Sequence, residues 1–236
     1  MITLLLQMIL AHIISDFILQ TNQIKDGKSG SLKKQKRSKY WYQIIHALTH
    51  AVVTYIVIGD WNSFVIPLVI MITHFVVDYI KCRKQNDKLS AFIIDQIAHL
   101  ALIFAVCWYF CSDFSIDLSS VGDFFNNTRA LKILIAYSLI LKPTSVLLLL
   151  FFKRWNIDTD GLQDAGCWIG YIERILILTF VITNHIEAVG FLLAAKSVFR
   201  FGDLKQSNEI KITEYVLIGT LTSFTIAIIL GLAVNL

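Results

Sequence analysis

The sequence has little charge for its length. Only 16% of its 236 residues are Asp, Glu, Lys or Arg, and 56% are hydrophobic, whereas soluble domains carry roughly 25% charged residues. A chain of this composition has too few polar side chains to cover the surface of a water-soluble fold. The composition therefore excludes a soluble globular protein and predicts an integral membrane protein.

Proline, cysteine motifs and internal repeats are also scarce. With 2 prolines and 11 glycines, no linker rich in these residues divides the chain. The 4 cysteines form no Cys-x-x-Cys pair and predict no structural disulfide. The net charge of +4 comes from lysines and arginines clustered between hydrophobic segments. Membrane topology explains this charge, so we expect no nucleic-acid binding.

Long hydrophobic segments predict transmembrane helices, which need about 20 mostly apolar residues. Eight segments qualify, at residues 2–20, 42–59, 62–80, 90–110, 130–152, 168–184, 186–202 and 212–235. The first segment lacks the basic start and small-residue cleavage site of a signal peptide, so we expect a retained span. The 186–202 segment is short and carries two basic residues, which leaves a re-entrant or tilted helix open.

The basic residues predict the orientation of these spans. They gather in alternate connections, at 21–41, 81–89, 153–154 and 200–211. Lysine and arginine in short loops favour the cytoplasmic side, so both termini are predicted to lie outside. The predicted fold is an all-α, polytopic transmembrane helix bundle of about eight spans. Residues 1–110 are expected to form a four-span metal-site bundle, and 111–236 a second four-span half of the same membrane domain.

Histidine and aspartate recur at a fixed spacing in the first four spans. His, Asp and Glu make up 23 of the 236 residues, so about one histidine in five would find such a partner four residues away by chance. Five of the six histidines do so. Residues i and i+4 share one helix face. Each of the four spans contributes one pair: His12–Asp16, His46–His50, His74–Asp78 and Asp95–His99.

The predicted topology places these four pairs at one depth. Two inward-running spans end with a pair and two outward-running spans begin with one, so all eight side chains lie within roughly 3–13 Å of the cytoplasmic boundary. Ionisable groups in a membrane are costly unless they satisfy one another, and a bound metal would do this. We therefore expect all eight to be metal ligands, with two zinc ions favoured over iron. The alternative is a proton or ion relay, or hydrogen-bonded polar packing.

Charged residues in the second half of the chain also lie toward the predicted cytoplasmic side, except for Lys142, which lies deeper in its span. We expect them to bind the anionic part of a substrate; they are Lys142, Glu173, Arg174, Lys196 and Arg200. In the alternative interpretation, the glutamate neutralises a neighbouring base and the outer cations extend to the membrane surface. Pro143 is predicted to kink its helix.

Several of these motifs resemble a known family. HIISDFILQ at 12–20, the His46/His50 pair, THFVVDYIK at 73–81 and DQIAH at 95–99 resemble the bacterial integral membrane family called domain of unknown function 3307. IGYIER at 169–174, GFLLAAKSVFRFGDLK at 190–205 and TEYVLIGTLTSF at 213–224 are similar to its C-terminal region. The resemblance implies a multi-pass protein of the bacterial cytoplasmic (inner) membrane and brings no activity with it. A weaker similarity is to inner-membrane metal-dependent hydrolases.

The function favoured by these patterns is a metal-dependent hydrolase acting on a lipid or a lipid-linked phosphate, ester or amide. Asp16 or Asp78 would then serve as the catalytic base rather than as a ligand. A di-iron oxidase, a metal-ion or proton-coupled transporter, and a structural metal site in a docking protein are the alternatives. The expected partners are membrane lipids and an anionic lipid or lipid-linked substrate, and the oligomeric state is left open.

Overall fold

The computed structural model describes the chain except for residues 30–35, 62, 85–87, 114–126, 156–164 and 199–206. All regular elements in this described part are helices, which confirms the predicted all-α fold there. The chain divides into two compact units, Met1–Ile135 and Ala136–Leu236. The predicted boundary at residue 110, and the packing of both halves into one membrane domain, stay predictions.

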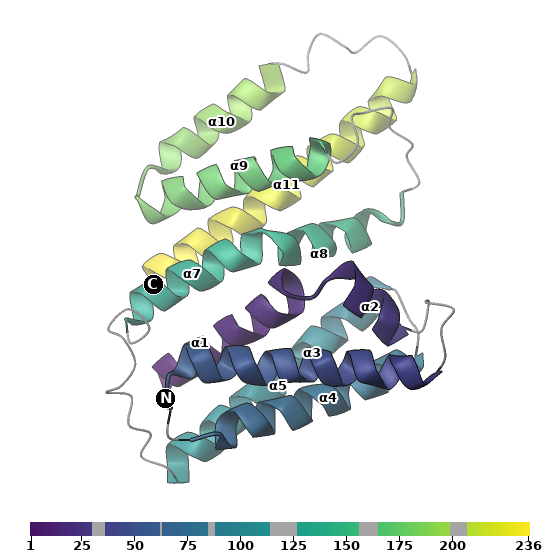
Figure 1. Cartoon of the computed structure of the whole chain (residues 1–236). Coiled ribbons are helices and arrows are strands. Elements are labelled where there is room, and N and C mark those ends of the chain that lie inside the picture. The colour runs from purple at the N-terminus through teal and green to yellow at the C-terminus, as the bar shows by residue number, and fades with distance from the viewer. Residues whose placement is uncertain (30–35, 62, 85–87, 114–126, 156–164, 199–206) are drawn as a thin grey trace. The chain divides into compact units, whose positions relative to one another are not determined.

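The first unit is built on a ring of four helices. Its elements are α1 (Ile2–Ile13), the π-helical η1 (Ile14–Ile18), α2 (Asn22–Ser29), α3 (Lys36–Ile58), α4 (Val65–Lys84) and α5 (Leu89–Asp113). α1 packs against α3 and α5, and α4 packs against the same two helices. The short α2 packs against α3 and lies at the end of the ring where α3 begins (Figure 1).

The ring is apolar outside and, over about half of its length, polar inside. One outward stripe on α3 (Ile44, Leu48, Val52, Ile56) and one on α4 (Leu68, Ile72, Val76, Ile80) are each 46–54% exposed. The facing inner positions include buried His, Asp, Gln and Thr. Water would not support this arrangement, whereas a bilayer favours apolar side chains outside and ionisable ones in the bundle interior. The fold is therefore that of a multi-pass membrane protein.

Six stretches within the described part are long and apolar enough to cross a membrane: Lys39–Ile58, Val65–Cys82, Leu89–Cys111, Thr128–Phe152, Ala165–Ile182 and Thr213–Asn235. A seventh is possible only if Ile2–Ile18 and Asn22–Lys28, which are bent by 89°, count as one span. The predicted 186–202 segment contains the 13-residue α10 (Ile186–Val198), and its last residues lie outside the described part. The count of eight spans and the position of the termini stay predictions.

Apolar packing fills one half of the ring. Its core lies where α1 and α4 begin and where α3 and α5 end, and its buried residues are Leu4, Met8, Ile58, Ile66, Ile70, Ile103, Val106, Cys107 and Phe110. Cys107 and Cys111 are both free, like the other two cysteines, as the absence of a cysteine motif predicted. The opposite half of the ring, where α1 ends and α3 begins, holds the polar residues.

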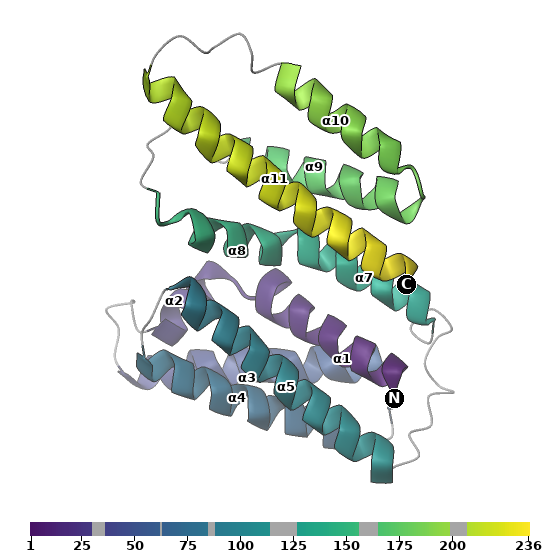
Figure 2. The same ribbon diagram turned by 180° about the vertical axis from the view of Figure 1, so that it is seen from behind.

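The second unit contains the end of α7 (Thr128–Ile140), then α8 (Lys142–Phe152), α9 (Ala165–Ile182), α10 and α11 (Ser207–Asn235). α9 packs against both α10 and α11, an arrangement that Figure 2 shows from behind. The helix breaks between α7 and α8 at Leu141, two residues before Pro143, which confirms the predicted interruption. A proline cannot donate the backbone hydrogen bond of a continuous helix.

Candidate metal centre

A π-helical turn positions the first carboxylate of the site. α1 ends at Ile13, and the backbone N–H of Leu19 then donates to the carbonyl oxygen of Ile14, five residues back, at 2.9 Å. This wider turn carries Asp16, one turn beyond His12. Single π-helical turns next to α-helices are frequent at functional sites. The chain bends sharply after this turn, so that α2 leaves the direction of α1.

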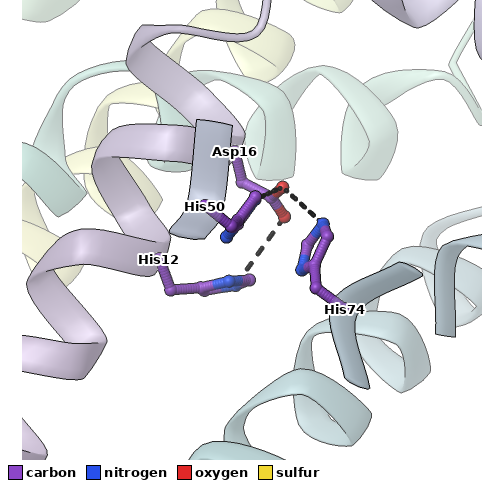
Figure 3. A group of neighbouring side chains, drawn as sticks. All are labelled: His12, Asp16, His50 and His74. Atoms are coloured by element: carbon purple, nitrogen blue, oxygen red, sulfur yellow. Dashed lines mark hydrogen bonds and ion pairs between the residues drawn. The ribbon is translucent and has the colours of Figure 1, made fainter. Parts of the chain in front are cut away.

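The Asp16 carboxylate lies among four imidazoles that come from three helices. Its Oδ1 is 2.9 Å from Nε2 of His46, 3.1 Å from Nε2 of His50 and 3.6 Å from Nε2 of His74. Its Oδ2 is 3.7 Å from Nε2 of His12. Figure 3 shows His12, His50 and His74 turned toward this carboxylate. One acceptor group therefore faces four Nε2 atoms at the centre of the ring.

The structure brings together all eight residues predicted as ligands. Their donor atoms form three overlapping groups, each with its atoms within 4.8 Å of one another: His12, Asp16, His50 and His74; His46, His74 and Asp78; and Asp78, Asp95 and His99. His74 belongs to the first two groups and Asp78 to the last two. Apart from Asp16, which is half-buried, the eight are at most 5% exposed. That they hold a metal stays a prediction.

The arrangement of the donor atoms suits a bound metal better than it suits hydrogen bonds among the eight side chains. Nε2 of His12, His74 and His99 and Oδ1 of Asp95 are buried, and they make no hydrogen bond within the described part of the chain. Buried polar atoms are nearly always hydrogen-bonded. These four atoms belong to residues of groups whose ligand atoms lie within 4.8 Å of one another, so cations bound in these groups would satisfy them. The first group offers three imidazoles and one carboxylate, which matches the four-coordinate, nitrogen- and oxygen-ligated sites of zinc.

Two lysines form ion pairs with carboxylates of the cluster. Both come from the Lys/Arg-rich segments that connect the predicted spans, at residues 21–41 and 81–89. Lys28 of α2 is buried, and its ammonium group bonds Oδ2 of Asp78. The ammonium group of Lys81 donates to Oδ2 of Asp95 at 2.6 Å. Sequence reasoning assigned both lysines to membrane topology. Lys81 follows Asp78 by three residues, so continuing the His74–Asp78 helix face by one turn would have predicted that Lys81 lies beside the cluster. No spacing of this kind in the sequence predicts the position of Lys28.

Two glutamines also lie on the helix faces that carry the ligand-type residues, one turn before or after a His/Asp or His/His pair. Gln20 follows Asp16 by four residues, and its Nε2 is 3.3 Å from Nε2 of His46. Gln43 precedes His46 by three residues and is 1% exposed, and its side-chain amide makes no hydrogen bond within the described residues. The polar layer is therefore wider than the His/Asp spacing alone indicated.

A small cavity adjoins the imidazoles on the side of the apolar core. Four of the histidines, His12, His50, His74 and His99, form one part of its lining. The other part consists of Thr54, Thr73 and apolar side chains that include Met8 and Ile70. The imidazole layer thus has a charged side and a neutral side. Lys28 and Lys81 lie on the side of the Lys/Arg-rich connections, and the cavity, whose lining within the described residues contains no Asp, Glu, Lys or Arg, lies toward the middle of the bundle.

The residues predicted to bind an anion lie in the second unit, where three of them have partners. Lys196 pairs with Glu173 at 2.6 Å, which is the alternative that the sequence left open. Arg174 is 3% exposed and donates to the Ile140 carbonyl and to the hydroxyl groups of Ser145 and Ser223. Lys142 is exposed, and Arg200 lies outside the described residues. A substrate-binding role for these five residues stays a prediction.

Fold and site together define a polytopic α-helical membrane protein with a buried His/Asp cluster between four helices. Residues 4–131 match the family described as protein of unknown function, DUF3307. This match covers more than half of the chain and all eight ligand-type residues, so the protein belongs to that family. It ends at residue 131, so the resemblance of the second half stays a prediction. No curated protein and no solved structure matches the chain.

Proposed function

We propose that the protein is a metal-dependent hydrolase of the bacterial cytoplasmic membrane, which acts on a lipid or a lipid-linked substrate. The observation that supports this most strongly is the convergence of five imidazoles and three carboxylates, nearly all buried, in overlapping groups with donor atoms within 4.8 Å. Within the described residues the buried Nε2 atoms of His12, His74 and His99 make no hydrogen bond, and a bound metal would offset the cost of about 1–3 kcal/mol of a buried polar atom without a partner.

The first group, around Asp16, is the best candidate for a tightly held zinc ion because it alone offers four ligands. Asp78 is shared by the other two groups, so they are candidates for a second ion. Zinc in such a site supplies Lewis acidity and lowers the pKa of water toward neutrality. The geometry favours Asp16 as a ligand, since four imidazole Nε2 atoms surround it. Of the two predicted catalytic carboxylates, Asp78 is therefore the candidate for general base when one zinc ion is bound, and it is a ligand when the second ion is bound.

The surroundings of the cluster support a membrane-derived substrate. The outer faces of α3 and α4 carry exposed aliphatic stripes that suit contact with acyl chains, while the ammonium groups of Lys28 and Lys81 lie on one side of the cluster. An amphiphile can lie with its chain along the outer faces and its head group toward the lysines. Hydrolysis at the head group would then occur within reach of the candidate metal ligands.

Elemental analysis of the protein purified in detergent tests the metal, and a lipid panel tests the reaction. We expect one or two zinc ions per chain, little iron, and hydrolysis of one member of a panel of phosphate, carboxylic ester and amide lipids. His50→Ala should abolish this hydrolysis, whereas His185→Ala, an exposed histidine outside the cluster, should not. Protein that binds no transition metal, or binds zinc but cleaves none of these bonds, would contradict the proposal.

A further inference from the structure

The packing of α2 against α3 fixes the position of Lys28 beside the cluster. α2 turns by 89° from the preceding helix and packs against α3. At Gly27 the α2 backbone comes so close to the Tyr42 ring that a methyl group would overlap it. This approach places Lys28, only 8% exposed, against Asp78. A buried lysine carries a high desolvation cost and is rarely found without a specific partner or role.

The second lysine reaches the same pair of carboxylates from outside. The Lys81 side chain is 47% exposed and ends 2.6 Å from Asp95 Oδ2. Ligand atoms of Asp78 and Asp95 lie within 4.8 Å of each other. The two ammonium groups therefore flank one small region, and Lys81 connects that region to the surface at the side of the basic connections.

The charges of these side chains indicate what this region can accept. Histidine binds a metal in its neutral form, so as metal ligands the five imidazoles add no charge, and the three carboxylates and two ammonium groups sum to −1. Two divalent cations would raise this to +3 in a low-dielectric setting, where uncompensated charge is unfavourable. One hydroxide and one phosphate monoester, which carries nearly two negative charges at neutral pH, would balance it. A neutral ester or amide would leave the excess in place.

We propose that Lys28 and Lys81 form a phosphate-binding subsite beside the candidate metal centre, and that the substrate is a phosphate monoester. This proposal rests on the function proposed above and narrows its substrate class. When Asp78 and Asp95 bind cations, their negative charge is partly neutralised, so both ammonium groups are released to donate to phosphate oxygens. Charge-assisted hydrogen bonds of this kind are roughly twice as strong as neutral ones.

Calorimetry with inorganic phosphate tests the subsite on the zinc-loaded, detergent-purified full chain after unbound zinc is removed. Lys28→Met and Lys81→Met should each weaken phosphate binding about tenfold, the loss of one charge-assisted hydrogen bond, with zinc content unchanged. Lys28→Arg should retain most of the binding. Lys25→Met is the matched control, because Lys25 lies one turn away on α2 and is exposed; its affinity should equal that of the wild type.

Competition separates a lipid phosphate from a soluble one. Short-chain phosphatidic acid and glycerol 3-phosphate, both monoesters, would each be titrated against bound phosphate. Stronger competition by phosphatidic acid assigns a lipid head group, and equal competition assigns a soluble ester.

The outcomes distinguish failure of the subsite from failure of the metal centre. If zinc binds but phosphate does not, the phosphate-binding subsite is contradicted and the metal centre is not. The same holds if phosphate binds Lys28→Met and Lys81→Met as tightly as it binds the wild type. If no zinc binds, the proposed function itself fails. If Lys28→Met does not fold, the half-exposed Lys81 still decides the result.

Discussion

Replacing Asp16 with asparagine should remove most of the stabilisation that zinc gives to the protein. Asparagine keeps the shape of the side chain but cannot supply the anionic carboxylate whose two oxygens lie 2.9–3.7 Å from four imidazole Nε2 atoms. Even outer-shell partners of a metal site change affinity by about 10–100-fold, so we expect at least about 100-fold weaker zinc binding. At free zinc 100 times the wild-type Kd, the zinc-linked stabilisation should fall from about 2.7 to about 0.4 kcal/mol.

The assay is thermal unfolding in detergent with and without buffered zinc. A difference of about 2.3 kcal/mol corresponds to a zinc-induced rise in Tm that is about 5–9 °C smaller in Asp16→Asn than in the wild type. Asp26→Asn removes the same charge from an exposed residue of α2 and should keep the full zinc-induced rise. An equal rise in wild type and Asp16→Asn would refute the assignment of Asp16 as a ligand.

Three further variants test other parts of the structure. His74→Ala should lose more bound zinc than His99→Ala in elemental analysis, because His74 belongs to two ligand groups and His99 to one; equal losses would contradict overlapping sites. Gly27→Ala should destabilise the protein by about 1–3 kcal/mol in chemical unfolding, since the added methyl group overlaps the Tyr42 ring; wild-type stability would mean that α2 is not packed this way. Arg174→Leu should lower the Tm by more than Lys196→Leu, because three hydrogen bonds of Arg174, two of them buried, lose their donor; a larger effect of Lys196→Leu would contradict this account of Arg174.

The eight-residue cluster was predictable because helical periodicity is a local property. A spacing of four residues fixes which side chains share a face, and the membrane fixes the depth at which each helix presents them. Both follow from sequence, so His12 and His99 could be assigned to one layer although 87 residues separate them. The same periodicity, extended by one turn, reaches Gln20, Gln43 and Lys81.

The position of Lys28 could not be predicted in this way. It depends on the 89° turn after η1 and on the contact between Gly27 and Tyr42, and neither follows from a repeat or a hydrophobic pattern. The hydrogen-bond partners of Arg174 were not predicted for a related reason. Sequence reasoning expected Arg174 to bind a substrate anion or to be neutralised by a neighbouring glutamate, whereas the break at Leu141 leaves a carbonyl group at Ile140 that its guanidinium binds.

The even division of the ligand-type residues has a consequence for how the protein is made. The α1–η1 segment and the helices α3, α4 and α5 carry two of them each. An aspartate costs about 2.5–3.5 kcal/mol at the centre of an inserting helix, so one helix with all eight would not enter the bilayer, whereas a long apolar segment tolerates two. Once inserted, each segment has polar groups that lipid cannot satisfy, and these favour lateral association with the other three. α5 is the last of the four to be synthesised, so all eight ligand-type residues are present only after α5, with Asp95 and His99, has been made.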